Sequence, residues 1–293
     1  MTAIEITGRI DAPTVVVLGG ISSSRHVTAT TANPNPGWWD GFVGPGKPID
    51  TLKFRVVSMD YLGGEGDDAL STHHQARALL DALDEAGIGK LHAVVGASYG
   101  GMVALSLAEL YPSRVERLIV IGAAHQSTPS ATAHRSLQRK VVELGFRAGL
   151  ESEALGIARG MAMTTYSTAS ELESRFDFDD PLEREREIDR FLTLAGTQFV
   201  SKCPPLRFLA LSQSLDRHFV NPTTITCRTT LVGVIEDYLV PPSQLRALAK
   251  AIPGPCELSL VSSIHGHDAF LEDQELIAPI VTRALHARAG AGV

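Results

Sequence analysis

Between residues 96 and 100 the chain reads Gly96-Ala97-Ser98-Tyr99-Gly100, a G-x-S-x-G motif. A β-branched run at residues 92–95 precedes it directly, and a helical pattern follows it to Leu110. A serine between a strand and a helix in this motif is typical of a nucleophile elbow, a sharp turn that exposes the hydroxyl. The turn strains the serine backbone, so the positions two residues away must lack side chains that would collide. The motif therefore predicts that Ser98 is a nucleophile.

Short apolar runs alternate with helical patterns on both sides of this turn. Ser71 or Thr72 can cap a helix that Gly87 ends. Strands that alternate with helices indicate parallel pairing with helices on both faces of the sheet. The sequence therefore predicts an α/β fold, with strands at residues 14–18, 54–59, 92–95, 117–121, 229–234 and 258–261 and further helices at 100–110, 243–251 and 274–286.

The alternation lapses between about residues 125 and 220, where helical segments follow one another without strands. We interpret residues 1–124 and 221–293 as one core, and residues 125–220 as a helical lid inserted over the carboxyl ends of the strands. A solvated linker is the alternative. Many apolar positions in this segment need burial, which favours a lid: Leu137, Leu144, Phe146, Met161, Leu192 and Phe199.

A serine hydroxyl needs a base, and the base needs an acid to orient it. In the α/β-hydrolase fold, which the strand order and the elbow predict, the acid and then the histidine follow the serine in the chain. Asp237 ends the next-to-last core strand and is the expected acid, with Glu236 as the fallback. The loop after the last strand offers two histidines, His265 and His267, between which the pattern does not decide.

Backbone amides are the expected stabilisers of the oxyanion. The N–H of Tyr99 lies at the start of a helix, where it can meet developing negative charge. Gly20 and Ile21 follow the strand at 14–18 and resemble the glycine-rich donor loops of esterases. A simple tight turn is the alternative interpretation of these glycines.

Composition excludes several classes of function. The chain has 293 residues, a formal charge of −7 and a pI near 5.8, so it carries no basic surface for nucleic acid. No apolar run approaches the ~20 residues that span a bilayer, and we expect no membrane association. Three scattered cysteines, Cys203, Cys227 and Cys256, suggest neither a disulfide framework nor a metal site. We expect a cytoplasmic protein without a bound metal.

The chain resembles the homoserine O-acyltransferases of the α/β-hydrolase superfamily along nearly its whole length. Its segment Gly37-Trp38-Trp39, followed by Gly44-Pro45-Gly46 and Ile49-Asp50-Thr51, is far more specific than the elbow, because generic esterases lack it. Further similarity lies at residues 61–64, 128–129, 138–139, 156–161, 165–166, 237–241 and in the GHDAFL sequence of residues 266–271.

The resemblance implies roles for individual residues. It favours His267 as the base, and it implies that Asp268 holds the amino group of an amino-acid acceptor while Arg159 and Tyr166 hold its carboxylate. It further implies acyl transfer from acetyl-CoA or succinyl-CoA to L-homoserine through an acyl-serine, in methionine biosynthesis. No bound cofactor is expected beyond the acyl-CoA co-substrate, and a homodimer through lid helices is implied.

Several departures from the family bear on the donor and the acceptor. The chain lacks the usual N-terminal extension and much of the loop that normally follows Leu62-Gly63-Gly64. Tyr99 stands where the family more often has Met or Leu, and Ser167 stands where an arginine is usual. Arg25 and Lys47 are candidate cations for a succinyl carboxylate.

Three other functions remain open at this level. L-serine differs from homoserine by one methylene, which a pocket discriminates by only ~1–3 kcal/mol. A plain serine esterase shares the same serine, acid and histidine. A catalytically silent binding protein of the same fold is the third alternative, against which the ordered Ser98, Asp237 and His267 argue.

Overall fold

The computed structural model describes residues 2–64 and 70–287, so the shortened loop predicted after Gly64 lies largely outside the described residues. Its main sheet has the strand order β1-β5-β2-β6-β7-β8-β9. β1 is antiparallel to β5, and every other pairing in this sheet is parallel. The strands are β1 (Ile4–Gly8), β2 (Thr14–Leu18), β5 (Arg55–Met59), β6 (Ala93–Ala97), β7 (Arg117–Ile121), β8 (Arg228–Val234) and β9 (Cys256–Val261).

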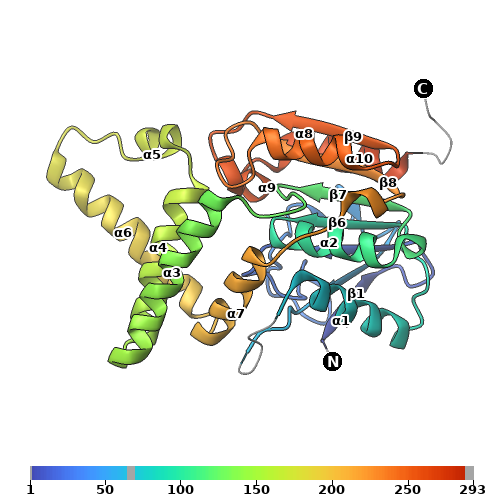
Figure 1. Ribbon diagram of the computed structural model, residues 1–293, viewed down its shortest axis with the longest axis horizontal. Coiled ribbons are helices and arrows are strands. Elements are labelled where there is room, and N and C mark those ends of the chain that lie inside the picture. Colours follow the sequence, from blue (N-terminus) through green and yellow to red (C-terminus); the bar gives the residue numbers. More distant parts are fainter. Residues whose placement is uncertain (1, 65–69, 288–293) are drawn as a thin grey trace.

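Helices cover both faces of this sheet (Figure 1). One apolar cluster joins the sheet to α1 (Thr72–Glu85), α2 (Tyr99–Leu110) and α8 (Pro242–Ala251). A second cluster joins the opposite face to α10 (Gln274–His286) and to the segment that carries the small pair β3 (Val43–Gly44) and β4 (Ile49–Asp50). Because both faces are covered, the central strands are buried along their length, which explains their continuous apolar sequences.

The α/β prediction is confirmed, and one strand of the main sheet was missed, as was the small pair of β3 and β4. β1 pairs with β5 at the edge of the sheet, although residues 1–11 look mixed and charged in the sequence. The residues of β1 are intermediate or exposed and none is fully buried, and Gly8 ends it with a φ of 83°. A short, half-exposed edge strand has no strong apolar pattern, so the sequence carried little signal for it.

The helical segment between β7 and β8 contains α3 (Pro129–Ala148), α4 (Glu151–Tyr166), α5 (Ala169–Arg175), α6 (Pro181–Val200) and α7 (Pro205–Asp216). These helices project from one end of the layered core (Figure 1). Residues of α3 and α4 line a cavity together with Ser98, which follows β6. The segment therefore lies over the carboxyl ends of the strands. We refer to α3–α7 as the lid helices.

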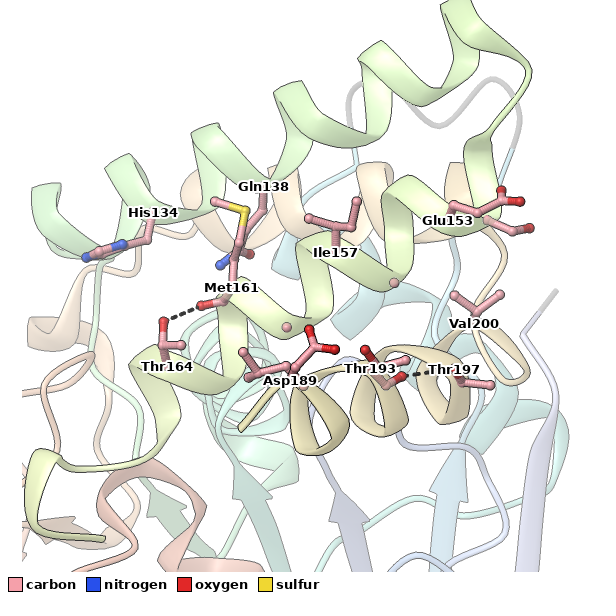
Figure 2. Close-up of a pocket in the computed structure, with 14 residues that line it drawn as sticks. His134, Gln138, Glu153, Ile157, Met161, Thr164, Asp189, Thr193, Thr197 and Val200 are labelled. Carbon is pink, nitrogen blue, oxygen red and sulfur yellow. Dashed lines mark hydrogen bonds between the residues drawn. The ribbon is translucent and has the colours of Figure 1, made fainter. Parts of the chain in front are cut away.

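The expected burial of apolar lid residues was only partly correct. Phe199 is buried, whereas Leu137, Leu144 and Phe146 are 53%, 57% and 38% exposed. Helices α3, α4 and α6 enclose a groove of ≈ 810 Å³, in which Ile157 and Met161 lie along one wall (Figure 2). Apolar side chains thus line a groove that the described residues leave open.

Candidate active site

Ser98 occupies a strained turn between β6 and α2. Its φ is 54° and its ψ is −121°, and it is the one non-glycine residue with positive φ in the described part of the chain. A Cβ on Gly96 would lie 2.3 Å from the carbonyl oxygen of Gly100, and a Cβ on Gly100 would lie 2.3 Å from that of Leu18. Both contacts are far below van der Waals distance, so the two glycines are sterically required, as the motif predicts.

A chain of hydrogen-bonding side chains starts at this serine. The Ser98 hydroxyl lies 2.8 Å from Nε2 of His267, and Nδ1 of His267 lies 2.7 Å from Oδ2 of Asp237. The other oxygen of Asp237 accepts hydrogen bonds from the amides of Leu239 and Val240. The Asp237 carboxylate is therefore held in place, and it in turn orients the imidazole.

The two alternatives that the sequence left open lie elsewhere. Glu236 accepts hydrogen bonds from the hydroxyl of Ser262 and the amide of Ser263. His265 faces a different carboxylate, with Nδ1 3.3 Å from Glu171. Neither side chain contacts Ser98.

Burial and charge oppose one another in this chain of side chains. Burial by itself would raise the pKa of Asp237, but the charge of His267 and the hydrogen bonds it receives lower the pKa below its ordinary value. Burial by itself would lower the pKa of His267, but the charge and hydrogen bond of Asp237 raise it. The pair is therefore arranged to stabilise an imidazolium, which is what a base needs after taking the serine proton.

The loop after β2 is held through its carbonyl groups. The Gly19 carbonyl accepts hydrogen bonds from the Gly100 amide at 2.9 Å and the Tyr61 hydroxyl at 2.7 Å. The Gly20 carbonyl accepts from the amide and hydroxyl of Ser23. Because a trans peptide directs its N–H away from its C=O, these bonds also fix the amides of Gly20 and Ile21.

The amides of Gly20, Ile21 and Tyr99 have no hydrogen-bond acceptor among the described residues. These are the amides that the sequence predicts as oxyanion donors. Tyr61, which fixes the Gly19 carbonyl, was recognised only as part of a similar segment, because nothing in the local pattern pairs it with residue 19.

The two tryptophans connect this loop to the histidine loop. A Cβ on Gly19 would lie 2.7 Å from the Trp38 ring, so the glycine allows that ring to pack closely. Trp38 stacks on Trp39 with ring centroids 5.1 Å apart. The indole N–H of Trp39 donates to the carbonyl of Phe270, three residues after His267. The segment that carries the family resemblance therefore has a positioning role.

The side chain of Tyr99 is fully buried, in contrast to its backbone amide. Its hydroxyl lies 2.8 Å from that of Ser214 on α7, and its ring meets Tyr61 edge to face at 4.8 Å. Burial raises the pKa of Tyr99 to about 12, so the phenol stays neutral. The side chain of Tyr99 therefore connects the turn at Ser98 to the lid helix α7 through a hydrogen bond.

The residues assigned to the acceptor gather beside His267. The guanidinium of Arg159 lies over the rings of Tyr166 and Phe199, 5.1 and 5.0 Å from their centroids. The Tyr166 ring is 5.7 Å from that of His267. Burial raises the pKa of Asp268, while the charges of His267 and Arg159 act against that rise. No side-chain hydrogen bond is found for Asp268 within the described residues.

A narrow cavity of ≈ 50 Å³ adjoins the nucleophile. Its walls include Ser98, His267, Tyr166, Gln138 and Arg135. Arg135 was not among the residues predicted from the sequence, because an arginine on a helix carries no signal of what it faces. The groove between α3, α4 and α6 shares His134 and Gln138 with this cavity but does not reach Ser98.

Within residues 2–64 and 70–287, no three His, Cys, Asp or Glu side chains are grouped so that they would hold a metal ion. None of the helices in the described ranges has the length and hydropathy needed to cross a bilayer. The three cysteines are free.

Residues 13–274 match the α/β hydrolase fold family. The chain is 38% identical to a homoserine O-succinyltransferase of Xanthomonas campestris pv. campestris, over 96% of this chain and 78% of that protein. It is 31% identical to a serine O-succinyltransferase of Litchfieldella anticariensis, over 96% of this chain and 90% of that protein.

Solved structures share the fold. A homoserine O-acetyltransferase from Bacillus anthracis aligns with a TM-score of 0.89 at 19% identity, over 99% of this chain and 93% of that one. Esterase E22 aligns with a TM-score of 0.86 at 20% identity, over 97% and 94% of the two chains. The sequence relatives, the strained serine turn and the two-tryptophan segment agree: this chain belongs to the homoserine O-acyltransferase family of the α/β-hydrolase superfamily.

Proposed function

We propose that this enzyme transfers an acyl group from an acyl-CoA to the hydroxyl of L-homoserine. The observation that carries the proposal is that Ser98 and His267 line a cavity beneath the lid helices, with Asp237 bonded to the far side of the imidazole. Asp268 and, through Tyr166, Arg159 lie near His267. The first group supplies a covalent nucleophile. The second supplies one cation and one anion for a zwitterionic amino acid.

In the first half-reaction the Ser98 oxygen attacks the thioester carbonyl as His267 takes its proton. Asp237 holds the imidazole tautomer and stabilises the imidazolium. The amides of Tyr99 and of Gly20 or Ile21 receive the oxyanion, an interaction whose loss typically costs ~3 kcal/mol per donor. The C–S bond then breaks, the CoA thiolate takes the proton, and an acyl-serine remains.

In the second half-reaction the homoserine hydroxyl gives its proton to His267 and attacks the acyl carbon of the acyl-serine. The bond from the acyl carbon to the Ser98 oxygen then breaks, and His267 returns the proton to that oxygen. The Asp268 carboxylate pairs with the acceptor ammonium, and Arg159 with Tyr166 binds its carboxylate. An arginine offers two parallel N–H donors to a carboxylate, which fixes orientation as well as charge. Held in this way beneath the lid helices, the acceptor hydroxyl competes with water for the ester.

A product assay tests this function. Acetyl-CoA and succinyl-CoA are each incubated with L-homoserine or L-serine, and products are identified by mass spectrometry. We expect an O-acyl-homoserine, and no product from a Ser98→Ala variant. Thioester cleavage at a rate independent of any amino acid would instead identify an esterase. A preference for L-serine would move the acceptor assignment to that amino acid.

The enzyme functions in this proposal as a homodimer through the lid helices, as the family resemblance implies. Support comes from the exposed apolar side chains of these helices, which include Leu144 and Ile157, and from the groove beside them (Figure 2). Analytical sedimentation of an Ile157→Glu variant tests the dimer. Ile10→Glu is the control, because Ile10 is exposed to a similar degree but lies just after β1, away from the lid helices. We expect only the lid variant to sediment as a monomer. Monomeric wild type would exclude the dimer.

The proposed setting is methionine biosynthesis in the cytoplasm. An O-acyl-homoserine is an activated form of homoserine, because the acyloxy group is a better leaving group than hydroxide. The free thiols of Cys203, Cys227 and Cys256 are compatible with a reducing compartment. Methionine auxotrophy on deletion of the gene, relieved by a supplied O-acyl-homoserine, is the expected result.

A further inference from the structure

Arg135 on α3 is a cation held against the cavity of the nucleophile. Its side chain is 12% exposed, and it lines the same cavity as Ser98 and His267. Nε donates to Asp216 at 2.6 Å, and Nη2 donates to Ser127 at 2.9 Å. These two bonds fix the plane of the guanidinium. Nη1 has no acceptor among the residues that the structure describes.

Arg135 shares its carboxylate partner with a second arginine. Arg139 lies one helical turn further along α3 and contacts the same carboxylate, with 2.7 Å between its Nη1 and Oδ2 of Asp216. Two arginines thus share one aspartate in a region where all three side chains are 12–14% exposed. Arg139 also donates to Ser212 and does not line the cavity. Arg135 is therefore the arginine of this pair that lines the cavity of the nucleophile.

The positive charge of Arg135 also acts on His267. Arg135 is among the groups whose charge acts to lower the pKa of His267. Arg135 already pairs with Asp216, and no second carboxylate of the described residues forms an ion pair with it. Its Nη1 is therefore available to a carboxylate of a ligand in the cavity, where a charge-assisted hydrogen bond is stronger than one between neutral groups.

We infer that Arg135 binds the distal carboxylate of a short dicarboxylic acyl group on Ser98, and that succinyl-CoA is the acyl donor. This rests on the proposed acyl transfer. Arg159 lies on α4 beside Tyr166, and Arg135 lies on α3 in the cavity, so the two arginines serve two carboxylates, one of the acceptor and one of the acyl chain. The cavity of ≈ 50 Å³ has room for a short chain only.

The chemistry of the half-reaction is unchanged by this contact. The bond from the Ser98 oxygen to the acyl carbon forms, the C–S bond breaks, and the serine proton passes through His267 to the CoA thiolate. The distal carboxylate exchanges no proton or electron. Arg135 is therefore a specificity residue, whose effect is on the choice of thioester.

The test measures acylation of Ser98 without any acceptor, as the burst of free CoA and the intact mass of the acyl-enzyme. The donors are succinyl-CoA, acetyl-CoA and butyryl-CoA, the last having the chain length of succinyl-CoA without its charge. We expect wild type to prefer succinyl-CoA over butyryl-CoA by about 10-fold or more, because a charge-assisted hydrogen bond contributes at least this much. Arg135→Gln is expected to lose this preference.

Two further variants make the result specific. Arg139→Gln removes the other partner of Asp216 and is expected to keep the donor preference. Arg135→Lys retains the positive charge without the planar guanidinium and is expected to keep part of the donor preference. This variant keeps the inference testable where Arg135→Gln does not fold. Thermal unfolding of each variant identifies loss of folded protein.

The inference is overturned where wild type does not discriminate succinyl-CoA from butyryl-CoA, or where Arg135→Gln slows all three donors equally. It is also overturned where the variant raises only the KM of homoserine, since Arg135 would then hold the acceptor. Formation of a succinyl-enzyme that homoserine does not discharge would contradict the proposed transferase function instead, and would leave the role of Arg135 intact.

Discussion

The indole N–H of Trp39 donates a hydrogen bond of 3.0 Å to the carbonyl of Phe270, a residue 231 positions further along the chain. Phe270 lies in α9 (Ala269–Glu272), directly after the turn that carries His267, and its ring meets the imidazole edge to face at 6.4 Å. Trp38, stacked on Trp39, packs against Gly19 in the loop that offers the oxyanion amides. One aromatic pair thus contacts both sides of the candidate active site.

Replacement of Trp39 by phenylalanine tests this connection. Trp39 is 1% exposed, so the smaller ring leaves a gap and an unpaired Phe270 carbonyl. We expect a loss of about 2–4 kcal/mol in the free energy of unfolding, measured with urea, together with a lower kcat. Trp38→Phe is the control, because Trp38 is less buried and its N–H bonds Ser24 near the surface. Equal stability of the Trp39 variant and wild type would contradict this role.

The glycines of the elbow differ sharply from glycines elsewhere. At Gly100 a Cβ would lie 2.3 Å from backbone, whereas at Gly89 no atom lies within 4 Å of the added carbon. We therefore expect Gly100→Ala to unfold or to lose about 3 kcal/mol or more of stability. Gly89→Ala should melt within a few degrees of wild type. A soluble, fully stable Gly100→Ala protein would mean that the turn relaxes more easily than its packing indicates.

The raised pKa of His267 has a consequence for the pH profile. Neutral imidazole is the form that accepts the serine proton, so activity falls as the pH drops through the pKa of His267. We expect the acid limb of kcat/KM to lie above that of an ordinary histidine. Asp237→Asn removes the charge that raises this pKa, so its acid limb should move to lower pH while kcat falls by about 10⁴-fold. An unchanged acid limb in that variant would exclude Asp237 as the cause.

Tyr61 is expected to act on the rate without binding substrate. Tyr61→Phe removes one of the two hydrogen bonds to the Gly19 carbonyl, which lets the adjoining Gly20 amide turn. A displaced oxyanion donor reduces stabilisation of the transition state more than it reduces binding of the substrate. We predict a drop in kcat of about 10-fold with little change in KM, measured by steady-state kinetics. A rise in KM alone would assign Tyr61 to substrate binding instead.

Substitution of Asp268 is expected to impair the second half-reaction and to leave the first unchanged. Asp268→Asn removes the anion that the proposal pairs with the acceptor ammonium, at a site where burial already opposes the charge. We expect the KM of homoserine to rise by about 10-fold or more, while acylation of Ser98 by the donor alone stays near the wild-type rate. Slower acylation in this variant would show that Asp268 affects the triad rather than the acceptor.

Local sequence was sufficient for the parts of this protein whose physical cause is local. The alternation of apolar strands and helices predicted the layered core, and G-x-S-x-G predicted the strained turn. The steric exclusion at Gly96 is local, because its Cβ would meet the carbonyl of Gly100, whereas the exclusion at Gly100 comes from Leu18 on the neighbouring strand. Chain order also brought the candidate acid and base to the ends of β8 and β9. It left Glu236 and His265 as competitors, and the choice of His267 came from the resemblance.

Tertiary structure decided what depends on contacts between distant parts of the chain. Periodicity does not say which apolar lid residues meet a partner, and Leu137 and Leu144 stay exposed. It gives no sign that Tyr61 holds Gly19, or that Arg135 faces Ser98 across the lid boundary. The physical reason is that a hydrogen bond or an ion pair depends on distance in space, whereas a sequence pattern records only distance along the chain.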